Sequence, residues 1–390
     1  MSLYIMYFSM NIGVMFGSRS VEHDVSITSA FWVMKWLEKM GKHSIFPIYV
    51  TRSGKWIFDK AFIEISSFKT FDEKNYADQE VKIVAWEKKK LVLEVGKSGW
   101  LSKPQILEID FVFPIFHGVN GEDGSVQWLL DILQVPYMGP GISGSAIGMN
   151  KIIMKDVFKS LALPITEYLV FKKGEADIEK IEKTIPYPII VKPANLGSSI
   201  GITKVKNTQE LKNALEVAFY YDAFALIEEC VQNLQELNCS VSEKNGEVIT
   251  SLVEQPVSTA EFLSFEEKYI ASDGGTMQGL KNKVKIPAEI PEHLSKKIQE
   301  YSKIIYTWLF CNGWAPRIDY LYDKIAWNLY VNEINTIPGA LQMHLWVKSG
   351  MSVSEFLENL IAVGLQKAKD KEINIDFQSN IIGHTIDFMK

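Results

Sequence analysis

Two carboxylates and an amide near the end of the chain have the residue types and spacing of a metal site. They lie in the apolar segment Pro316–Asn335, whose pattern predicts a hairpin of two strands. On a strand, Glu333 and Asn335 project from the same face because they are two residues apart. The hairpin folds Asp319 back towards them, and oxygen ligands of this kind suit Mg²⁺ that bridges nucleotide phosphates. The alternative is a solvent-facing sheet edge on which Arg317 pairs with Asp319.

A glycine loop after an apolar strand is a candidate cradle for phosphates. The strand Pro188–Pro193 carries Lys192 near its end, and the loop Gly197–Gly201 follows with the sequence GSSIG. Backbone N–H groups and hydroxyls of such a loop can hold phosphate oxygens, while the lysine supplies a positive charge. The alternative is a surface turn with a solvated lysine, because a single glycine loop is a weak motif.

Two further segments join the end of a strand to the start of a helix. The apolar strand Phe111–Phe116 ends at His117, and a GEDG turn then opens a helix. Near the start of the chain, Glu22 lies between a strand and a helix in the segment Gly17–Ser26. Ligands of open α/β sheets bind at the carboxyl ends of parallel strands, so both segments are candidate binding sites. The alternatives are a packed histidine and an ordinary helix cap.

The elements around these segments predict an α/β fold that continues into mixed strands and helices. Apolar strands and helical spacing alternate in the first 140 residues, which favours a parallel sheet. A junction rich in proline and glycine follows, and later strands and helices form more compact units. We expect a parallel, Rossmann-like domain over 1–140, a small domain over 141–225, a third domain over 226–375 and a tail of unassigned role over 376–390.

The composition excludes several classes of protein. The 390 residues exceed one typical domain, and 41 basic against 47 acidic residues give a net charge of −6. The absence of a basic block argues against a nucleic-acid partner. The sequence has no uninterrupted apolar run of about 20 residues, so no membrane span is predicted. The three cysteines form no CxxC pair, which is typical of free thiols in a reducing cytosol.

Taken together, the segments resemble the D-alanine–D-alanine ligases of the ATP-grasp superfamily over about residues 11–370. The resemblance implies an ATP-grasp fold preceded by a Rossmann-like domain. It rests on four motifs in the family's order: GSRSVEHDVS at Gly17–Ser26, HGVNGEDG at His117–Gly124, PYMG at Pro136–Gly139 and MNK at Met149–Lys151.

The resemblance also implies roles for individual residues. Those matched to ATP binding are Lys151, Lys192, Ser199, Glu228, Glu229, Glu236 and Lys268. Those matched to the magnesium ligands, for which Mn²⁺ is a substitute, are Asp319, Glu333 and Asn335. Those matched to catalysis are Glu22, Ser198, Tyr269, Arg317 and Gly339, and those matched to substrate binding are Glu22, His117, Tyr269, His344 and Leu345.

The function implied is ligation of two D-alanines through an acyl phosphate, giving D-alanyl-D-alanine, ADP and phosphate for peptidoglycan synthesis. A cytoplasmic homodimer is implied with it. Two departures from the family concern the acceptor: His344 replaces the usual serine, and the candidate lid, Ser264–Lys285, is longer than usual. The retained Tyr269 favours an amine acceptor over a hydroxy acid. The alternatives are a ligase making a different dipeptide and a non-catalytic homologue that binds a nucleotide or an amino acid.

Overall fold

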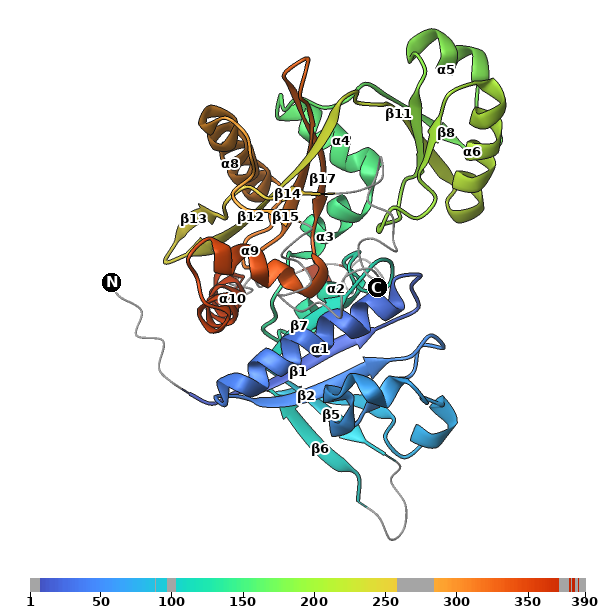
Figure 1. The fold of residues 1–390 in the computed structure, drawn as a ribbon. Helices are drawn as coiled ribbons and strands as arrows, with labels where there is room; N and C mark the ends of the chain where they lie inside the picture. Colours follow the sequence, from blue (N-terminus) through green and yellow to red (C-terminus); the bar gives the residue numbers. More distant parts are fainter. Residues whose placement is uncertain are drawn as a thin grey trace.

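The computed structural model describes residues 8–87, 89–96, 103–257 and 284–371, together with residues 379, 381, 382 and 385. Within these residues, three four-stranded sheets follow one another along the chain, and two smaller sheets accompany them. Figure 1 shows the first sheet at one end of the molecule and the other two at the opposite end. The predicted α/β architecture is confirmed.

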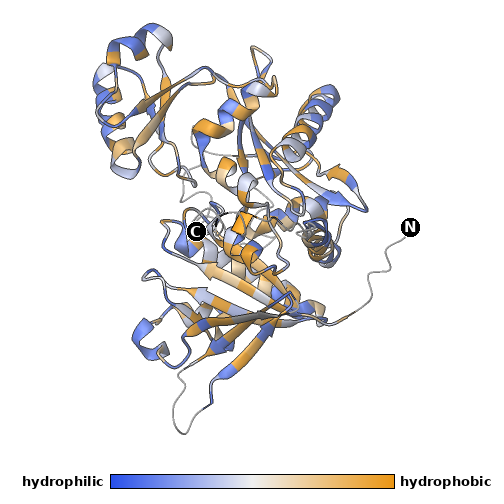
Figure 2. Cartoon of the chain, turned by 180° about the vertical axis from the view of Figure 1, so that it is seen from behind, coloured by the Kyte–Doolittle hydropathy of each residue, from blue (hydrophilic) through white to orange (hydrophobic). Residues whose placement is uncertain are grey.

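The first sheet has the parallel strands expected from the apolar pattern. Strands β2, β1 and β7 run parallel, and β3 adds an antiparallel edge. Helix α1 connects β1 to β2 and buries Ala30, Val33 and Leu37, which recur at helical spacing. Figure 2 shows hydrophobic residues gathered along these strands. The bounds are β1 (Asn11–Gly17), α1 (His23–Met40), β2 (Ser44–Val50), β3 (Trp56–Phe58), β7 (Phe111–Phe116) and α2 (Ser125–Ile132).

A small antiparallel sheet, in the order β4-β5-β6, packs beneath the first sheet and was not anticipated. Its inner side chains, Leu91, Leu93 and Leu107, share a core with Met15 and Val112 of the parallel strands. The bounds of this sheet and of the preceding 3₁₀ turns are η1 (Lys60–Ile63), η2 (Ile65–Phe68), η3 (Glu73–Tyr76), β4 (Val81–Glu87), β5 (Lys90–Val95) and β6 (Gln105–Ile109).

The second sheet is antiparallel, in the order β10-β9-β11-β8. Helices α5 and α6 share its core, where Ile181 and Leu211 pack against Ile189 and Ile227. The glycine loop connects β9 to β10. The bounds are β8 (Tyr168–Lys172), α5 (Ile178–Thr184), β9 (Ile189–Pro193), β10 (Thr203–Val205), α6 (Thr208–Tyr221) and β11 (Phe224–Glu229).

The third sheet, in the order β13-β12-β16-β17, contains the predicted hairpin as β16 and β17. Helices α8 and α4 both pack on this sheet. Met154 and Phe158 of α4 lie in its core, although α4 precedes the second sheet in the chain. The bounds are α3 (Ile142–Met149), α4 (Lys151–Ser160), β12 (Leu234–Lys244), β13 (Glu247–Thr250), β14 (Gln255–Pro256), β15 (Val284–Lys285), α8 (Glu292–Trp308), β16 (Arg317–Asp323) and β17 (Asn328–Asn335).

The last helices return to the first sheet and close the fold. Trp346 of α9 stacks on Phe356 of α10 with ring centroids 5.5 Å apart, and both side chains lie in the core that contains α1. No helix in the described parts of the chain is long and apolar enough to cross a bilayer. The bounds are η6 (Gly339–Gln342), α9 (Met343–Lys348) and α10 (Val353–Asp370).

Candidate active site

Two buried lysines share one buried carboxylate at the junction of the second and third sheets. Glu228 of β11 lies 2.5 Å from Lys192 Nζ of β9 through one oxygen and 2.5 Å from Lys155 Nζ of α4 through the other. The three residues are only 1–4% exposed. Burial alone would raise the pKa of Glu228, but the two ammonium groups reverse this effect and lower it. Two cations against one anion leave a surplus positive charge, which suits a phosphate group.

Lys151 extends this positive surface towards the third sheet. Its Nζ lies 3.1 Å from Glu333 Oε2 and donates to the Leu196 carbonyl over 2.7 Å. Sequence reasoning identified Lys151 and Lys192 but missed Lys155. A signal was present, because residues four apart on a helix share a face and Lys155 follows Lys151 by four.

The glycine loop meets the N-terminal part of the chain. The Ser198 hydroxyl donates a hydrogen bond to the Glu22 carboxylate. Gly197 approaches so closely that a Cβ there would lie 2.9 Å from Glu22 Oε2, so a larger residue would displace the contact. Ser198 and Ser199 both have a positive φ, of 52° and 61°. The structure therefore brings Glu22 and Ser198 together across 176 positions of sequence.

The predicted metal ligands lie on the β16–β17 pair. Asp319 stands directly opposite Glu333, and Arg317 stands opposite Asn335, with a bulge immediately after Asp319. Carboxylates directly opposite one another repel unless a cation lies between them. Asp319 also receives two hydrogen bonds from Arg317, from Nε over 2.5 Å and from Nη2 over 2.6 Å.

This geometry bears on both interpretations of the segment. The Arg317–Asp319 pair exists, and its two side chains are only 15% and 16% exposed on the inner strand β16, whereas β17, which carries Glu333 and Asn335, is the edge strand of the sheet. In the described parts of the chain no cluster of three or more His, Cys, Asp or Glu side chains is present. Two carboxylates and the amide of Asn335 nevertheless fit Mg²⁺, which takes few protein ligands and completes its shell with phosphates and water.

A buried glutamate ties the N-terminal loop to the segment after β17. Glu122 accepts hydrogen bonds from Gly118 N over 3.0 Å, Thr336 Oγ1 over 2.8 Å and Ile337 N over 2.9 Å. Asn335 precedes these last two donors directly. Glu122 therefore holds the end of the strand that carries the predicted metal ligands, a role that the sequence did not reveal.

Replacing Glu122 by glutamine is expected to change how stability depends on pH. Burial and the nearby charge of Glu22 raise the pKa of Glu122 from 4.5 to about 7. Between these values the folded chain binds more protons than the unfolded chain, so this group's contribution to the free energy of unfolding falls as the pH rises. The free energy of unfolding of the wild type, minus that of Glu122→Gln, should decrease by about 3 kcal/mol as the pH rises from about 4.5 to about 7. Urea unfolding of both proteins would measure this difference. A constant difference would show that Glu122 titrates normally.

His117 is not placed as an anion-binding cation. Its Nε2 lies 2.9 Å from Ser29 Oγ, and that hydroxyl also accepts a hydrogen bond from Ala340 N over 3.1 Å. Burial lowers the pKa of His117 to about 4, so the ring is neutral near pH 7. His117 thus contacts Ser29, which in turn binds the backbone N–H of Ala340, the residue after Gly339.

The remaining predicted residues fall into three groups. Glu229 and Glu236 are half-buried, one at the end of β11 and the other in β12. Gly339 begins η6, whereas Leu345 of α9 is fully buried. The third group, Lys268 and Tyr269 with nearly all of the candidate lid, lies outside the described residues.

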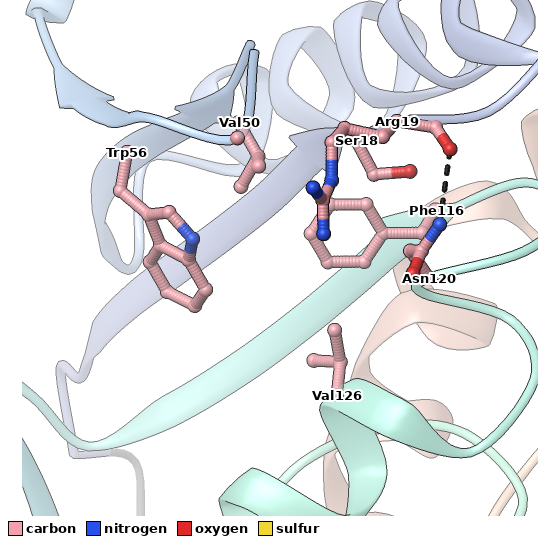
Figure 3. A pocket seen from close by; sticks show the side chains of 8 residues that line it. Ser18, Arg19, Val50, Trp56, Phe116, Asn120 and Val126 are labelled. Atoms are coloured by element: carbon pink, nitrogen blue, oxygen red, sulfur yellow. Dashed lines mark hydrogen bonds between the residues drawn. The ribbon is translucent and has the colours of Figure 1, made fainter. Parts of the chain in front are cut away.

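A pocket lies in the N-terminal part of the chain, where β1, β2 and β7 end. Figure 3 shows Arg19 and Trp56 on its wall, with Asn120 donating a hydrogen bond to the Arg19 carbonyl over 3.1 Å. None of the predicted site residues that the structure describes lines it. The charged junction between the sheets therefore remains the candidate active site.

Comparisons with known proteins identify the family of this chain. Residues 11–140 match the family described as D-ala D-ala ligase N-terminus, and residues 157–362 match D-ala D-ala ligase C-terminus. The D-alanine–D-alanine ligase of Thermosipho melanesiensis is 37% identical over 96% of this chain and 98% of its own, and that of Natranaerobius thermophilus is 36% identical over 94% and 97%.

Solved structures give the same result. The VanG D-Ala:D-Ser ligase of Enterococcus faecalis is 31% identical, with a TM-score of 0.73, over 91% of this chain and 99% of its own. The D-alanine–D-alanine ligase of Helicobacter pylori is 27% identical, with a TM-score of 0.72, over 91% and 98%.

Proposed function

This chain belongs to the D-alanine–D-alanine ligase family and is an ATP-dependent ligase, and from this premise we propose how its residues join two D-alanines. The observation that carries the proposal is the junction of positive and negative groups between two sheets. Lys192 and Lys155 share Glu228 on one side, and Asp319 opposes Glu333 on the other.

The lysines serve the first step, in which a D-alanine carboxylate takes the γ-phosphoryl group of ATP. A free carboxylate is a poor acylating agent, whereas an acyl phosphate reacts readily with an amine. Lys151, Lys155 and Lys192 neutralise charge on the phosphates, and Ser199 in the glycine loop closes over them. Glu229 and Glu236 bind the adenine and the ribose. Mg²⁺, when bound by Asp319, Glu333 and Asn335, neutralises negative charge on the phosphates.

Arg317 and Gly339 serve the second step, in which the amine of the acceptor attacks the acyl carbon. The attack places negative charge on the acyl oxygen, and the guanidinium and the Gly339 N–H donate hydrogen bonds to it. The double hydrogen bond with Asp319 supports this role because it fixes the plane of the guanidinium. Collapse of the intermediate expels phosphate and leaves the peptide bond.

Glu22, Ser198 and Tyr269 anchor the substrate in this proposal. The Glu22–Ser198 hydrogen bond links the N-terminal part of the chain to the glycine loop, which supports a shared role. Closing the loop would also keep water from the acyl phosphate.

Replacing Asp319 by asparagine is expected to raise the Mg²⁺ concentration needed for half-maximal activity about tenfold, because a charged ligand becomes a neutral one. The fold should persist, since the two side chains have the same shape. Titrating activity with Mg²⁺, and Mn²⁺ binding by electron paramagnetic resonance, would measure the change. Asp131→Asn, at a surface ion pair with Lys371, is the matched control. Equal metal requirements in all three proteins would contradict the assignment.

The experiment that tests the function is phosphate release from Mg·ATP with D- and L-amino acids, singly and in pairs, with products identified by mass. Release with D-alanine alone and a D-alanyl-D-alanine product would support the proposal. Release only with another pair would indicate a different dipeptide ligase. No release with any amino acid would contradict catalysis.

Further proposals concern the setting of the enzyme. The reaction supplies a peptidoglycan precursor, which supports a cytoplasmic location, and the family resemblance supports a homodimer. The three large sheets support three domains, but β11 of the second sheet crosses the boundary predicted between residues 225 and 226.

A further inference from the structure

Three polar side chains form a series of hydrogen bonds between elements that border the candidate active site. Asn195 donates to Asp222 Oδ2, from its backbone N–H over 2.7 Å and from Nδ2 over 2.9 Å. Asn195 Oδ1 accepts a hydrogen bond from Asn150 Nδ2 over 2.8 Å. Asn195 is 27 positions from Asp222 and 45 positions from Asn150, and all three residues are half-buried. We call Asn150, Asn195 and Asp222 the amide tether.

At one end, the amide tether holds the start of α4. Asn150 is the N-cap of this helix, and its Oδ1 accepts hydrogen bonds from the backbone N–H groups of the second and third helical residues over 3.1 and 3.0 Å. Because the cap occupies Oδ1, Nδ2 is the atom that donates to Asn195, which fixes the orientation of both amides. Lys151 begins α4 and Lys155 lies about one turn later, so the tether acts on the position of both ammonium groups.

In the middle, the amide tether holds the start of the glycine loop. Asn195 follows β9 and precedes the loop Gly197–Gly201. The residues on either side of it also bind α4: the Ala194 carbonyl accepts from Lys151 N over 2.9 Å, and the Leu196 carbonyl accepts from Lys151 Nζ over 2.7 Å. The second contact uses an ammonium group that we assign to phosphate, whereas the tether uses side chains outside the proposed ATP contacts. The tether can therefore persist when the nucleotide is bound.

At the other end, Asp222 belongs to the turn between α6 and β11, and this turn contacts both ends of the glycine loop. Asp222 Oδ1 accepts a hydrogen bond from Phe224 N over 3.1 Å, which leaves Oδ2 for Asn195 at the start of the loop. At the end of the loop, a Cβ on Gly201 would lie 3.3 Å from Tyr221 Cδ2. The turn therefore fixes both ends of the segment whose serines are proposed to contact the substrate and the phosphates.

The position of the amide tether predicts an effect on nucleotide affinity, and the alternative is an effect on stability alone. The bonds to Asp222 are charge-assisted, and such bonds are stronger than those between neutral groups. Without them, α4 and the loop would move relative to one another, and ATP would have to order them when it binds. This penalty falls on the ground state and the transition state alike, because both contain the bound phosphates. The KM for ATP should therefore rise while kcat changes little.

We propose that Asn195 is a positioning residue for ATP, which aligns the glycine loop with the lysines of α4 before the nucleotide binds. The inference rests on the proposed function, because it requires phosphates between the loop and the ammonium groups of Lys151 and Lys155. Asn195 acts through these groups and does not itself contact the nucleotide. Asp222 and Asn150 fix its amide, through Nδ2 and Oδ1 respectively.

The test compares nucleotides with and without phosphates. In Asn195→Ala, the Kd for Mg·ATP from isothermal titration calorimetry and the KM for ATP should both rise about tenfold, because the side-chain bonds to a carboxylate and to an amide are lost. The Kd for adenosine, kcat and the KM for D-alanine should change little. Asn213→Ala is the matched control, since this exposed asparagine of α6 also accepts a side-chain hydrogen bond, from Gln209 Nε2 over 3.2 Å.

A charge exchange separates the amide tether from a general loss of folding. Asn195→Asp keeps the shape of the side chain but places a carboxylate against Asp222, so the KM for ATP should rise at least as much as in Asn195→Ala. Adding Asp222→Asn removes the like charge and returns an amide to the pair, so the double variant should recover most of the affinity. Urea unfolding would establish that each variant is folded under the assay conditions.

Three results would overturn the inference while the proposed function stands. These are an unchanged Kd for Mg·ATP in Asn195→Ala, an equal loss of affinity for adenosine and Mg·ATP, and an exchange variant no better than Asn195→Asp. If Asn195→Ala does not fold, the exchange decides alone. By contrast, a wild type that binds Mg·ATP but releases no phosphate with any amino acid would contradict the proposed function, and the binding measurements would still test the tether.

Discussion

Replacing Arg317 by lysine is expected to lower kcat about 10²- to 10³-fold, the cost typical of losing one donor to an oxyanion. Lysine keeps the positive charge but lacks the planar fork, so it cannot make both hydrogen bonds to Asp319. The ammonium would then lie in several positions instead of one. Because the lost interaction develops with the transition state, the KM for ATP should change much less than kcat.

Arg52→Lys is the matched control for this variant. Arg52 also pairs with an aspartate, through Nη2 and Asp24 Oδ1 at 2.9 Å, but its side chain is 57% exposed. Its replacement should leave kcat unchanged. Steady-state kinetics and thermal unfolding of both variants would separate a catalytic defect from a folding defect. A loss of ATP affinity equal to the loss of kcat in Arg317→Lys would place the arginine at the nucleotide instead.

Local patterns explain why much of the fold was predictable. The hairpin β16–β17 has alternating apolar residues and a short turn, so its two strands could be assigned without further information. The parallel strands around β1 are apolar on both faces, which is typical of a sheet covered by helices. The same alternation placed Asp319, Glu333 and Asn335 on neighbouring strands.

Contacts between distant parts of the chain explain what was missed. Glu254 and His344 are 90 residues apart, and Glu122 and Thr336 are 214 apart. No local spacing links such pairs, because tertiary packing brings them together. The same limit applies to His117: its position after a strand is visible in the sequence, whereas its burial behind Ser29 depends on the whole fold.

The charge of Glu228 between Lys155 and Lys192 is expected to have a large effect on the stability of the fold. Replacing Glu228 by glutamine is expected to lower the free energy of unfolding by about 3–5 kcal/mol, because two buried ammonium groups lose their counter-charge. Burial and the charge of Lys192 lower the pKa of Lys155, so this ammonium group depends on the charge of Glu228. Urea unfolding of the wild type and the variant would measure the loss. Glu179→Gln, at the exposed Lys183–Glu179 pair, should show no measurable change.

Two additions separate an electrostatic cause from a loss of packing. In Glu228→Gln, a second change of Lys155→Met should recover part of the stability, because it removes one uncompensated charge. ATP should also stabilise Glu228→Gln more than it stabilises the wild type, since phosphate oxygens would replace the missing negative charge. If neither the second substitution nor ATP restores stability, the loss comes from packing around position 228. Recovery with both would show that the charge imbalance between the two sheets favours a bound polyphosphate.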